Sequence, residues 1–205
     1  MQQIAPVVLS GRTVRLVPLR MQHASALFEV AQDQDIWAYM PARPDSSLAA
    51  MEASIQQTLA AQQAGRELPF AIVRLEDDRV VGSTRYLDIV PQHRGLEIGW
   101  TWLGATARRT SINTECKYLL LGYAFETLGA IRVQLKTDSR NLRSQQAIER
   151  LGAIKEGTLR NHIIMPDGYY RHTVYYSIIE SEWPQVKARL EARLSQHPQT
   201  DRMTD

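Results

Sequence analysis

The segment Val133–Gly157 reads V-Q-L-K-T-D-S-R-N-L-R-S-Q-Q-A-I-E-R-L-G-A-I-K-E-G, and its pattern sets the architecture that we expect of the chain. Its first six residues alternate apolar and polar side chains, as a half-buried strand does. After a short polar break, Asn141 stands at the expected N-cap of a helix whose apolar residues recur at helical spacing. Gly152 follows the last of them and is a common C-terminal stop. The segment therefore predicts a strand, a turn and a short helix that carries Asn141 and Ser144 on its first turn.

This arrangement holds two small hydrogen-bonding side chains at the carboxyl edge of a sheet, where open α/β sheets bind ligands. It resembles the Asn-x-x-Ser segment of the GNAT N-acetyltransferases, and the A-I-x-x-L-G-A-x-x-E-G that follows is typical of their RimJ/RimL-type branch. The resemblance implies that Asn141 bonds the pantetheine arm of acetyl-CoA and that Ser144 lies near the thioester sulfur. The alternative is that Asn141 only caps its own helix and Ser144 is an ordinary first-turn residue.

The length and composition are those of an ordinary globular protein. The chain has 205 residues, of which 44% are hydrophobic and 22% charged, enough for one domain with a sizeable core. We expect a single acetyltransferase domain over residues 1–205, with a core at about 11–195 and a disordered polar tail at 197–205. The net charge of +2 is too small to indicate nucleic acid as the main partner.

The cysteine content and the N-terminus bear on the cellular compartment. The single Cys116 excludes an intramolecular disulfide and fits a reducing cytoplasm. Because it falls in an apolar helical pattern, we expect it to be buried and structural. The first ten residues do not read as a signal peptide, and no stretch of about 18 apolar residues could span a membrane. No spacing of Cys, His and Asp predicts a metal site. We therefore expect a cytoplasmic protein with neither a membrane partner nor a metal.

The patterns along the chain predict a strand, two helices, three strands, a helix, a strand, a helix, two strands and a helix. In chain order the expected elements cover 12–19, 21–34, 47–63, 69–75, 80–90, 96–103, 113–128, 133–138, the helix between Asn141 and Gly152, 163–165, 169–179 and a helix from about 183. This order resembles the GNAT fold over nearly the whole chain. The resemblance implies a mixed, mostly antiparallel α/β (α+β) sheet of about seven strands, with helices on both faces and a splayed central strand pair.

The segment Ala107–Glu115, A-R-R-T-S-I-N-T-E, stands where the helix after strand 96–103 begins. A helix N-terminus offers unpaired N–H groups and a partial positive charge to phosphate. The GNAT proteins that it resembles carry Gln/Arg-x-x-Gly-x-Gly/Ala there, whereas Ser111 and Asn113 replace the two small residues. The resemblance implies that coenzyme A binds through Arg108, Arg109, Thr110, Ser111, Asn113 and Thr114. The alternative is that Thr110 or Ser111 merely caps the helix and that the two arginines form a solvated surface pair.

Acetyl transfer to an amine needs a base, a donor for the oxyanion and a hydrogen bond or proton for the leaving thiolate. The resemblance implies a bulge in strand 96–103 and backbone contacts from Trp102 and Leu103 to the pantetheine amides. Glu97 on that strand is the candidate base, acting directly or through water; the alternative is a glutamate that is simply solvated. Ser144 is the candidate group for stabilising the thiolate.

The loop that contains Tyr39 and Arg43, together with the last hairpin, is expected to form the acceptor wall. Arg43 is the residue that we expect carboxylate-bearing acceptors to meet. The last hairpin also resembles the RimJ/RimL branch, except that His172 stands where an acidic residue is usual. Tyr175 or Tyr176 could reach the acyl site, although aromatic residues on strands usually serve the core.

Two functions follow as hypotheses. The first is transfer of an acetyl group from acetyl-CoA, the cosubstrate, to a primary amine of a small molecule or a protein N-terminus, by direct attack in a ternary complex. The alternative, motivated by Ser111 and Asn113, is a non-catalytic acyl-CoA-binding or regulatory module with a degenerate pyrophosphate loop. The family resemblance makes a homodimer plausible.

Overall fold

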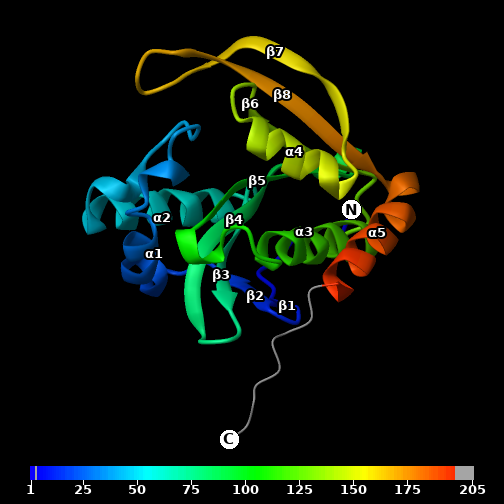
Figure 1. Ribbon diagram of the computed structural model, residues 1–205, viewed down its shortest axis with the longest axis horizontal. Coiled ribbons are helices and arrows are strands. Elements are labelled where there is room, and N and C mark those ends of the chain that lie inside the picture. The colour runs from blue at the N-terminus through cyan, green and yellow to red at the C-terminus, as the bar shows by residue number, and fades with distance from the viewer. Residues whose placement is uncertain (3, 197–205) are drawn as a thin grey trace, which may run out of the picture.

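Eight strands form one sheet in this computed structural model, which describes residues 1–2 and 4–196 (Figure 1). The strands are β1 (Leu9–Ser10), β2 (Val14–Pro18), β3 (Leu68–Arg74), β4 (Arg79–Val90), β5 (Gly95–Leu103), β6 (Arg132–Asp138), β7 (Ile154–Ile164) and β8 (Tyr170–Ile179). Their order is β1-β2-β3-β4-β5-β6-β8-β7, and only the β5–β6 pair is parallel. The expected mixed, mostly antiparallel sheet is confirmed. The predicted tail at 197–205 lies outside the described residues.

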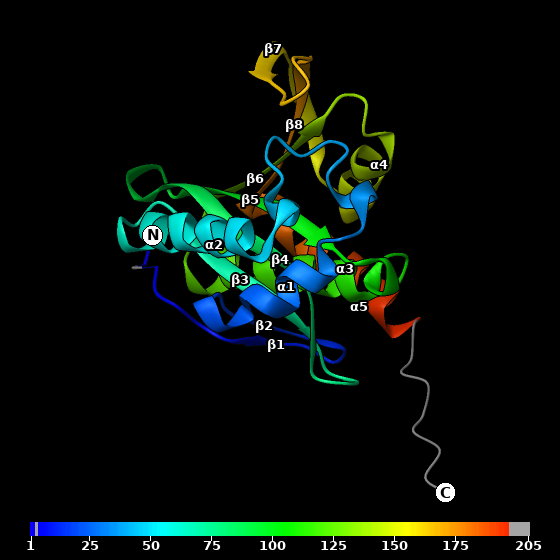
Figure 2. The same cartoon turned by 90° about the vertical axis from the view of Figure 1, so that its left-hand side faces the viewer.

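Helices cover both faces of this sheet, as predicted (Figures 1 and 2). They are α1 (Ala24–Val30), α2 (Leu48–Gln63), α3 (Ile112–Gly122), α4 (Leu142–Leu151) and α5 (Trp183–Ser195). Alternate residues of β3 divide the core, because successive side chains point to opposite faces. Phe70 and Ile72 pack in the larger cluster with α3, α4 and α5, whereas Ala71 packs in the smaller cluster with α1 and α2.

The helix boundaries follow local capping chemistry where the sequence carries it. Ser47 caps α2 by accepting the Ala50 N–H at 3.0 Å. Gly152 ends α4 at φ 105°, a left-handed conformation that glycine adopts without strain. The helix predicted over 21–34 is shorter than expected: a 3-10 turn precedes α1, which ends at Val30. The Trp37 indole N–H donates to the Ala31 carbonyl at 2.8 Å, so a tertiary bond takes the place of the next helical turn.

Two strands differ from the prediction. β1 has only two residues, too few for a periodic pattern, and raises the strand count from about seven to eight. β7 runs over Ile154–Ile164 rather than 163–165 alone. It is the outer strand of a long hairpin and is exposed along nearly its whole length, so its sequence has no buried side to alternate with (Figure 1).

The central strand pair is splayed, as the family resemblance implies. β5 and β6 pair over only three residue pairs, which end at Glu97 opposite Gln134. Beyond that point β5 continues beside β4, and β6 continues beside β8. The register between β4 and β5 shifts between Ser83 and Arg85, where Trp100 adopts φ 49°. A bulge of this kind bends its strand, and here it directs β5 away from β6.

Some classes of site can be checked over the described part of the chain. No helix there is both long and apolar enough to cross a membrane. Within the same residues, no group of three or more His, Cys, Asp and Glu side chains is arranged to hold a metal ion. Cys116 is buried, as predicted, and burial raises the pKa of its thiol to about 12. A thiol with that pKa stays protonated and unreactive near neutral pH.

Candidate functional site

Glu97 occupies the last residue pair that joins β5 to β6, at the point where the two strands separate. Its side chain is 2% exposed, and Oε2 accepts hydrogen bonds from Lys136 Nζ at 3.0 Å and Gln134 Nε2 at 2.8 Å. A Cβ atom at Gly99 would lie 2.8 Å from Oε1, so the missing side chain makes room for this oxygen. No residue of the described chain hydrogen-bonds Oε1. One carboxylate oxygen is thus fixed by β6, and the other lies along β5 beside the splayed region.

The environment of Glu97 changes its acidity. Burial raises its pKa above the ordinary value, and the charge of Lys136 and the Gln134 hydrogen bond only partly oppose that effect. Burial acts on Lys136 in the opposite sense, but the charge and hydrogen bond of Glu97 keep the ammonium pKa raised. A carboxylate with a raised pKa is a stronger base, which suits proton abstraction near neutral pH.

The side chain of Glu97 belongs to a polar face of the sheet, on the side covered by α1 and α2. Register places even-numbered residues of β6 and odd-numbered residues of β8 on that side, since Lys136 pairs with Tyr175. We give the name polar face to seven residues on this side of the sheet: Glu97, Gln134, Lys136, Asp138, Arg171, Thr173 and Tyr175. Tyr176 points the other way, and its hydroxyl donates to Glu149 of α4 at 3.0 Å. Of the two candidate tyrosines, only Tyr175 shares the face of Glu97.

Asn141 and Ser144 lie just beyond the carboxyl end of β6, as the sequence predicts. Asn141 Oδ1 accepts the Ser144 N–H at 3.0 Å, so this side chain does cap α4. The cap uses only the carbonyl oxygen of the amide, and the two N–H donors of the same group are still available for another acceptor. The Ser144 side chain is half-buried, and its hydroxyl has no hydrogen-bond partner among residues 1–2 and 4–196.

The start of α3 shows how each predicted phosphate ligand is used. Thr110 Oγ1 accepts the Ile112 N–H at 3.2 Å and donates to the Ala107 carbonyl at 2.8 Å, so Thr110 caps the helix. Ser111 occupies the N-cap position without a side-chain bond to the helix. The guanidinium of Arg108 forms an ion pair with Asp33 and is therefore already neutralised. Arg109 is exposed, and its backbone adopts φ 63°.

The half-buried Asn113 and Thr114 occupy the first turn of α3, where helical geometry gives backbone N–H groups no carbonyl partner within the helix. Glu115, on the same turn, is a residue whose role the sequence does not reveal. Its buried carboxylate accepts the backbone N–H of Thr13 at 2.8 Å and of Val14 at 3.2 Å. Those partners lie more than 100 positions away in the chain, so no local sequence pattern predicts the contact. Glu115 anchors the start of β2 rather than a ligand.

Lys117 is a second buried charge that the sequence analysis did not single out. It lies on α3 with 6% exposure, and its Nζ donates to Thr101 Oγ1 at 2.5 Å. Thr101 shares a further hydrogen bond with Thr84 at 2.8 Å. Burial lowers the pKa of Lys117 to about 8. The ammonium therefore lies against the β5 bulge on the α3 side of the sheet.

The elements predicted to form the acceptor wall do meet. Arg140, in the turn after β6, stacks on the ring of Tyr169 with 3.6 Å to the centroid and lies 5.7 Å from the ring of Tyr39. Arg171 Nη1 donates to the Tyr39 carbonyl at 3.3 Å. Arg43, by contrast, is held by Asp45 at 3.0 Å and by Gln34. The guanidinium expected to meet acceptor carboxylates is thus already paired within its own loop.

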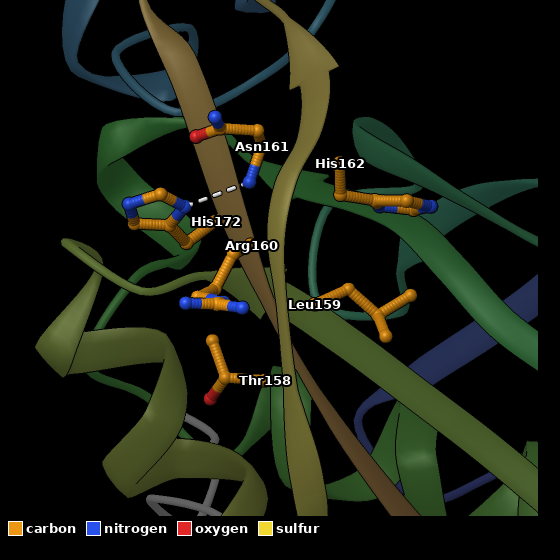
Figure 3. Close-up of a pocket in the computed structure, with 6 residues that line it drawn as sticks. All are labelled: Thr158, Leu159, Arg160, Asn161, His162 and His172. Atoms are coloured by element: carbon orange, nitrogen blue, oxygen red, sulfur yellow. Dashed lines mark hydrogen bonds between the residues drawn. The ribbon is translucent and has the colours of Figure 1, made fainter.

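A hollow of about 900 Å³ lies on the long hairpin and is lined by Thr158, Leu159, Arg160, Asn161, His162 and His172 (Figure 3). Leu159 and His162 project to one side of β7, and Arg160 and His172 to the other (Figure 3). The lining residues are thus divided between the two sides of an edge strand, which is adjacent to neither β5 nor β6 in the sheet. His172 Nδ1 accepts the Asn161 N–H at 2.9 Å and braces the irregular part of β7. That bond gives His172 a structural role in the hairpin.

Comparison with known proteins adds an independent line of evidence. Residues 13–154 match the family model described as an acetyltransferase (GNAT) domain. A GCN5-related N-acetyltransferase from Brucella melitensis has 28% identity and a TM-score of 0.87, over 93% of this chain and 86% of that one. A protein of T. thermophilus, provisionally described as an acetyltransferase, has 39% identity and a TM-score of 0.85, over 94% and 100%. Mycobacterium smegmatis RimJ, solved with CoA-disulfide, shares the fold at 23% identity, with a TM-score of 0.81 over 92% and 95%. The curated proteins contain no match.

Proposed function

Because this chain belongs to the GNAT acetyltransferase family, we propose that it transfers the acetyl group of acetyl-CoA to a primary amine by direct attack in a ternary complex. Family membership makes the chain an N-acetyltransferase enzyme and favours this function over the non-catalytic module. The motif at residues 147–157 supports our proposal that it belongs to the RimJ/RimL-type branch. The acceptor that we propose is a small-molecule amine or a protein N-terminus. We also propose that residues 1–205 are one acetyltransferase domain. The observation that carries the proposal is the uncommitted Oε1 of Glu97 at the point where β5 leaves β6.

The residues present fit acetyl-CoA along the whole length of that molecule. The backbone of β5 near Trp102 and Leu103 pairs with β4 on one side only, so its other edge can bond the pantetheine amides. The side-chain N–H donors of Asn141 suit a pantetheine carbonyl. Arg109 and the first-turn N–H groups of α3 suit the phosphates, because a helix N-terminus carries a partial positive charge.

The chemistry divides between Glu97 and Ser144. Acetyl-CoA supplies the acetyl group as a reactive thioester. Glu97 Oε1 takes the proton from the acceptor ammonium, directly or through one water, and Lys136 and Gln134 hold Oε2 in place meanwhile. The neutral amine nitrogen then bonds to the thioester carbonyl carbon, and the carbon–sulfur bond breaks. The Ser144 hydroxyl donates a hydrogen bond to the departing sulfur, and the thiolate takes up the proton that the nitrogen loses on becoming an amide. Holding the two reactants together contributes several kcal/mol more by removing entropic cost.

The test of this proposal is Glu97→Gln, assayed with purified protein, acetyl-CoA and a panel of amines by release of free thiol. Loss of the base should lower kcat about a hundredfold at pH 7. Activity should recover partly above pH 9, where more of the amine is already deprotonated. Glu76→Gln, which changes an exposed glutamate, is the matched control and should behave as the wild type. An unchanged kcat and pH profile in Glu97→Gln would remove Glu97 from the mechanism.

A further inference from the structure

Arg171 of β8 is a buried arginine with an unsatisfied donor, and we propose that it binds a carboxylate carried by the acceptor amine. Its side chain belongs to the polar face and is 5% exposed. Nε is buried and has no hydrogen-bond partner, and Nη1 donates a bond of 3.3 Å to the Tyr39 carbonyl. The inference rests on the proposed function, because it names the acceptor class of the same site.

The positive charge of Arg171 is not balanced by a carboxylate of the polar face, because each of those carboxylates is already paired with another cation. Asp138, its nearest acidic neighbour along the sheet, is bound by Arg140 Nη2 at 2.8 Å and by the Arg140 backbone N–H at 2.8 Å. Glu97 is bound by Lys136. Each carboxylate on this face therefore has another cation as its direct partner. Arg171 keeps its guanidinium in a buried position without an acidic partner of its own among the described residues.

That arrangement is costly unless an anion binds. A buried N–H donor without a partner loses its hydration and gains nothing in exchange. The planar guanidinium matches a carboxylate, which can accept two parallel hydrogen bonds from it. A carboxylate from an acceptor would therefore satisfy the unused Nε and neutralise the charge at once. Specificity of this type comes from a buried polar group that the wrong substrate leaves unpaired.

The position of Arg171 also indicates where the carboxylate lies relative to the amine. Glu97 is level with Gln134, which is level with Ser177 of β8. Arg171 is six positions from Ser177, or ~20 Å along an extended strand. Burial lowers the pKa of Arg171, and the charge of Asp138 opposes this most, ahead of that of Glu97. Arg171 and Glu97 share one face of the sheet, so the gap between their charged ends is shorter wherever the two side chains extend toward each other. The acceptor carboxylate should therefore be several bonds from the amine.

The loop between α1 and α2 supplies the opposite wall. The Tyr39 carbonyl holds one end of the Arg171 guanidinium, and this segment reaches toward β6 and β8 (Figure 2). Arg43 in the same loop is already paired with Asp45. Arg171, rather than Arg43, is thus the residue that the structure makes available for a carboxylate.

Matched acceptor pairs test this inference. The wild-type protein is assayed with acetyl-CoA and 6-aminohexanoate against hexylamine, and with 4-aminobutanoate against butylamine, by thiol release. Within at least one of these pairs, we expect kcat/KM to be about tenfold to a hundredfold higher for the amino acid than for the matched amine without a carboxylate. Arg171→Gln should abolish that preference, because it should lower kcat/KM for the amino acid and leave kcat/KM for the matched amine unchanged. Arg171→Lys should keep part of it, and Arg79→Gln, which changes an exposed arginine, should keep all of it.

A second readout keeps the two proposals separable. Each acid and its plain amine are also tested for a shift in melting temperature of wild-type protein and Arg171→Lys, without acetyl-CoA. Turnover of amines without any preference for the acids would overturn the role of Arg171 and leave the proposed function intact. No turnover with any amine would count against the proposed function; the melting shift then decides alone, and equal shifts for acid and amine would refute the carboxylate site. If Arg171→Gln does not fold, the wild-type pairs and Arg171→Lys decide between these outcomes.

Discussion

Replacing Lys117 with methionine should stabilise the protein at neutral pH, because this lysine places a positive charge in the interior. Burial lowers the pKa of Lys117 to about 8 from an ordinary value of 10.5. That difference corresponds to on the order of 3 kcal/mol of unfavourable free energy in the folded, protonated state. Methionine has a similar unbranched shape, and Thr101 keeps its hydrogen bond to Thr84. We therefore expect Lys117→Met to gain roughly 1–3 kcal/mol of unfolding free energy at pH 7.

The sign of the pH dependence follows from the same pKa. Below pH 8 the folded and unfolded chains both hold the proton, so the cost of burial is present in full. Between pH 8 and 10.5 the unfolded chain binds more protons than the folded one, and wild-type stability should rise relative to the variant. Above pH 10.5 the lysine is neutral in both states, and the charge contributes nothing further.

The assay is urea unfolding of wild type and Lys117→Met at pH 7, 8, 9 and 10. Other titrating groups are common to both proteins, so the difference in unfolding free energy isolates Lys117. Lys155→Met, which alters an exposed lysine of β7, is the control and should give a small, constant difference. A difference that does not change with pH, or a variant less stable than the wild type at pH 7, would refute the reasoning.

Two further predictions concern Asn141 and Gly99. Asn141→Asp keeps the oxygen that caps α4 but loses the N–H donors, so KM for acetyl-CoA should rise severalfold with little change in stability, whereas Asn141→Ala should also lose about 1 kcal/mol. Steady-state kinetics and thermal unfolding check both, and an unchanged KM in Asn141→Asp would leave Asn141 as a cap only. Gly99→Ala would place a Cβ 2.8 Å from Glu97 Oε1 and 2.9 Å from Leu87, and should lower kcat about tenfold by displacing the carboxylate. Gly157→Ala, where a Cβ meets nothing within 4 Å, is its control; equal activity of the two variants would show that Oε1 does not need that space.

Local signals made much of the fold predictable. The cap at Asn141 and the stop at Gly152 mark α4 because both depend on backbone conformations that particular residues favour. The alternation of buried and half-buried residues likewise places β6, whereas β3 is marked by a continuous apolar run because it is buried on both faces. β7 has no such signal, since an exposed strand has no buried side to alternate with, and its bulge is braced by His172 from the neighbouring strand.

The candidate site was predictable only in part, because its partners come from distant parts of the chain. The family resemblance singled out Glu97, Asn141 and Ser144, and their roles in one site stay a prediction. The sequence could not tell that Arg108 is neutralised by Asp33, 75 positions away, or that Arg43 is paired while Arg171 is not. These differences arise from tertiary packing, which leaves no trace in spacing or periodicity.

The short contact between β5 and β6 also has a consequence for how durable the protein is. Only three residue pairs between β5 and β6 join the two halves of the described sheet, β1 to β5 and β6 to β8. A cosubstrate that binds between the separated ends of β5 and β6 and forms hydrogen bonds to both strands would hold the two halves of the sheet together, as an additional strand would. Any ligand that binds only the folded chain raises its unfolding free energy by RT ln(1 + [L]/Kd), where [L] is the concentration of free ligand. The acetyl-CoA supply of a cell would then govern the lifetime of this enzyme as well as its rate.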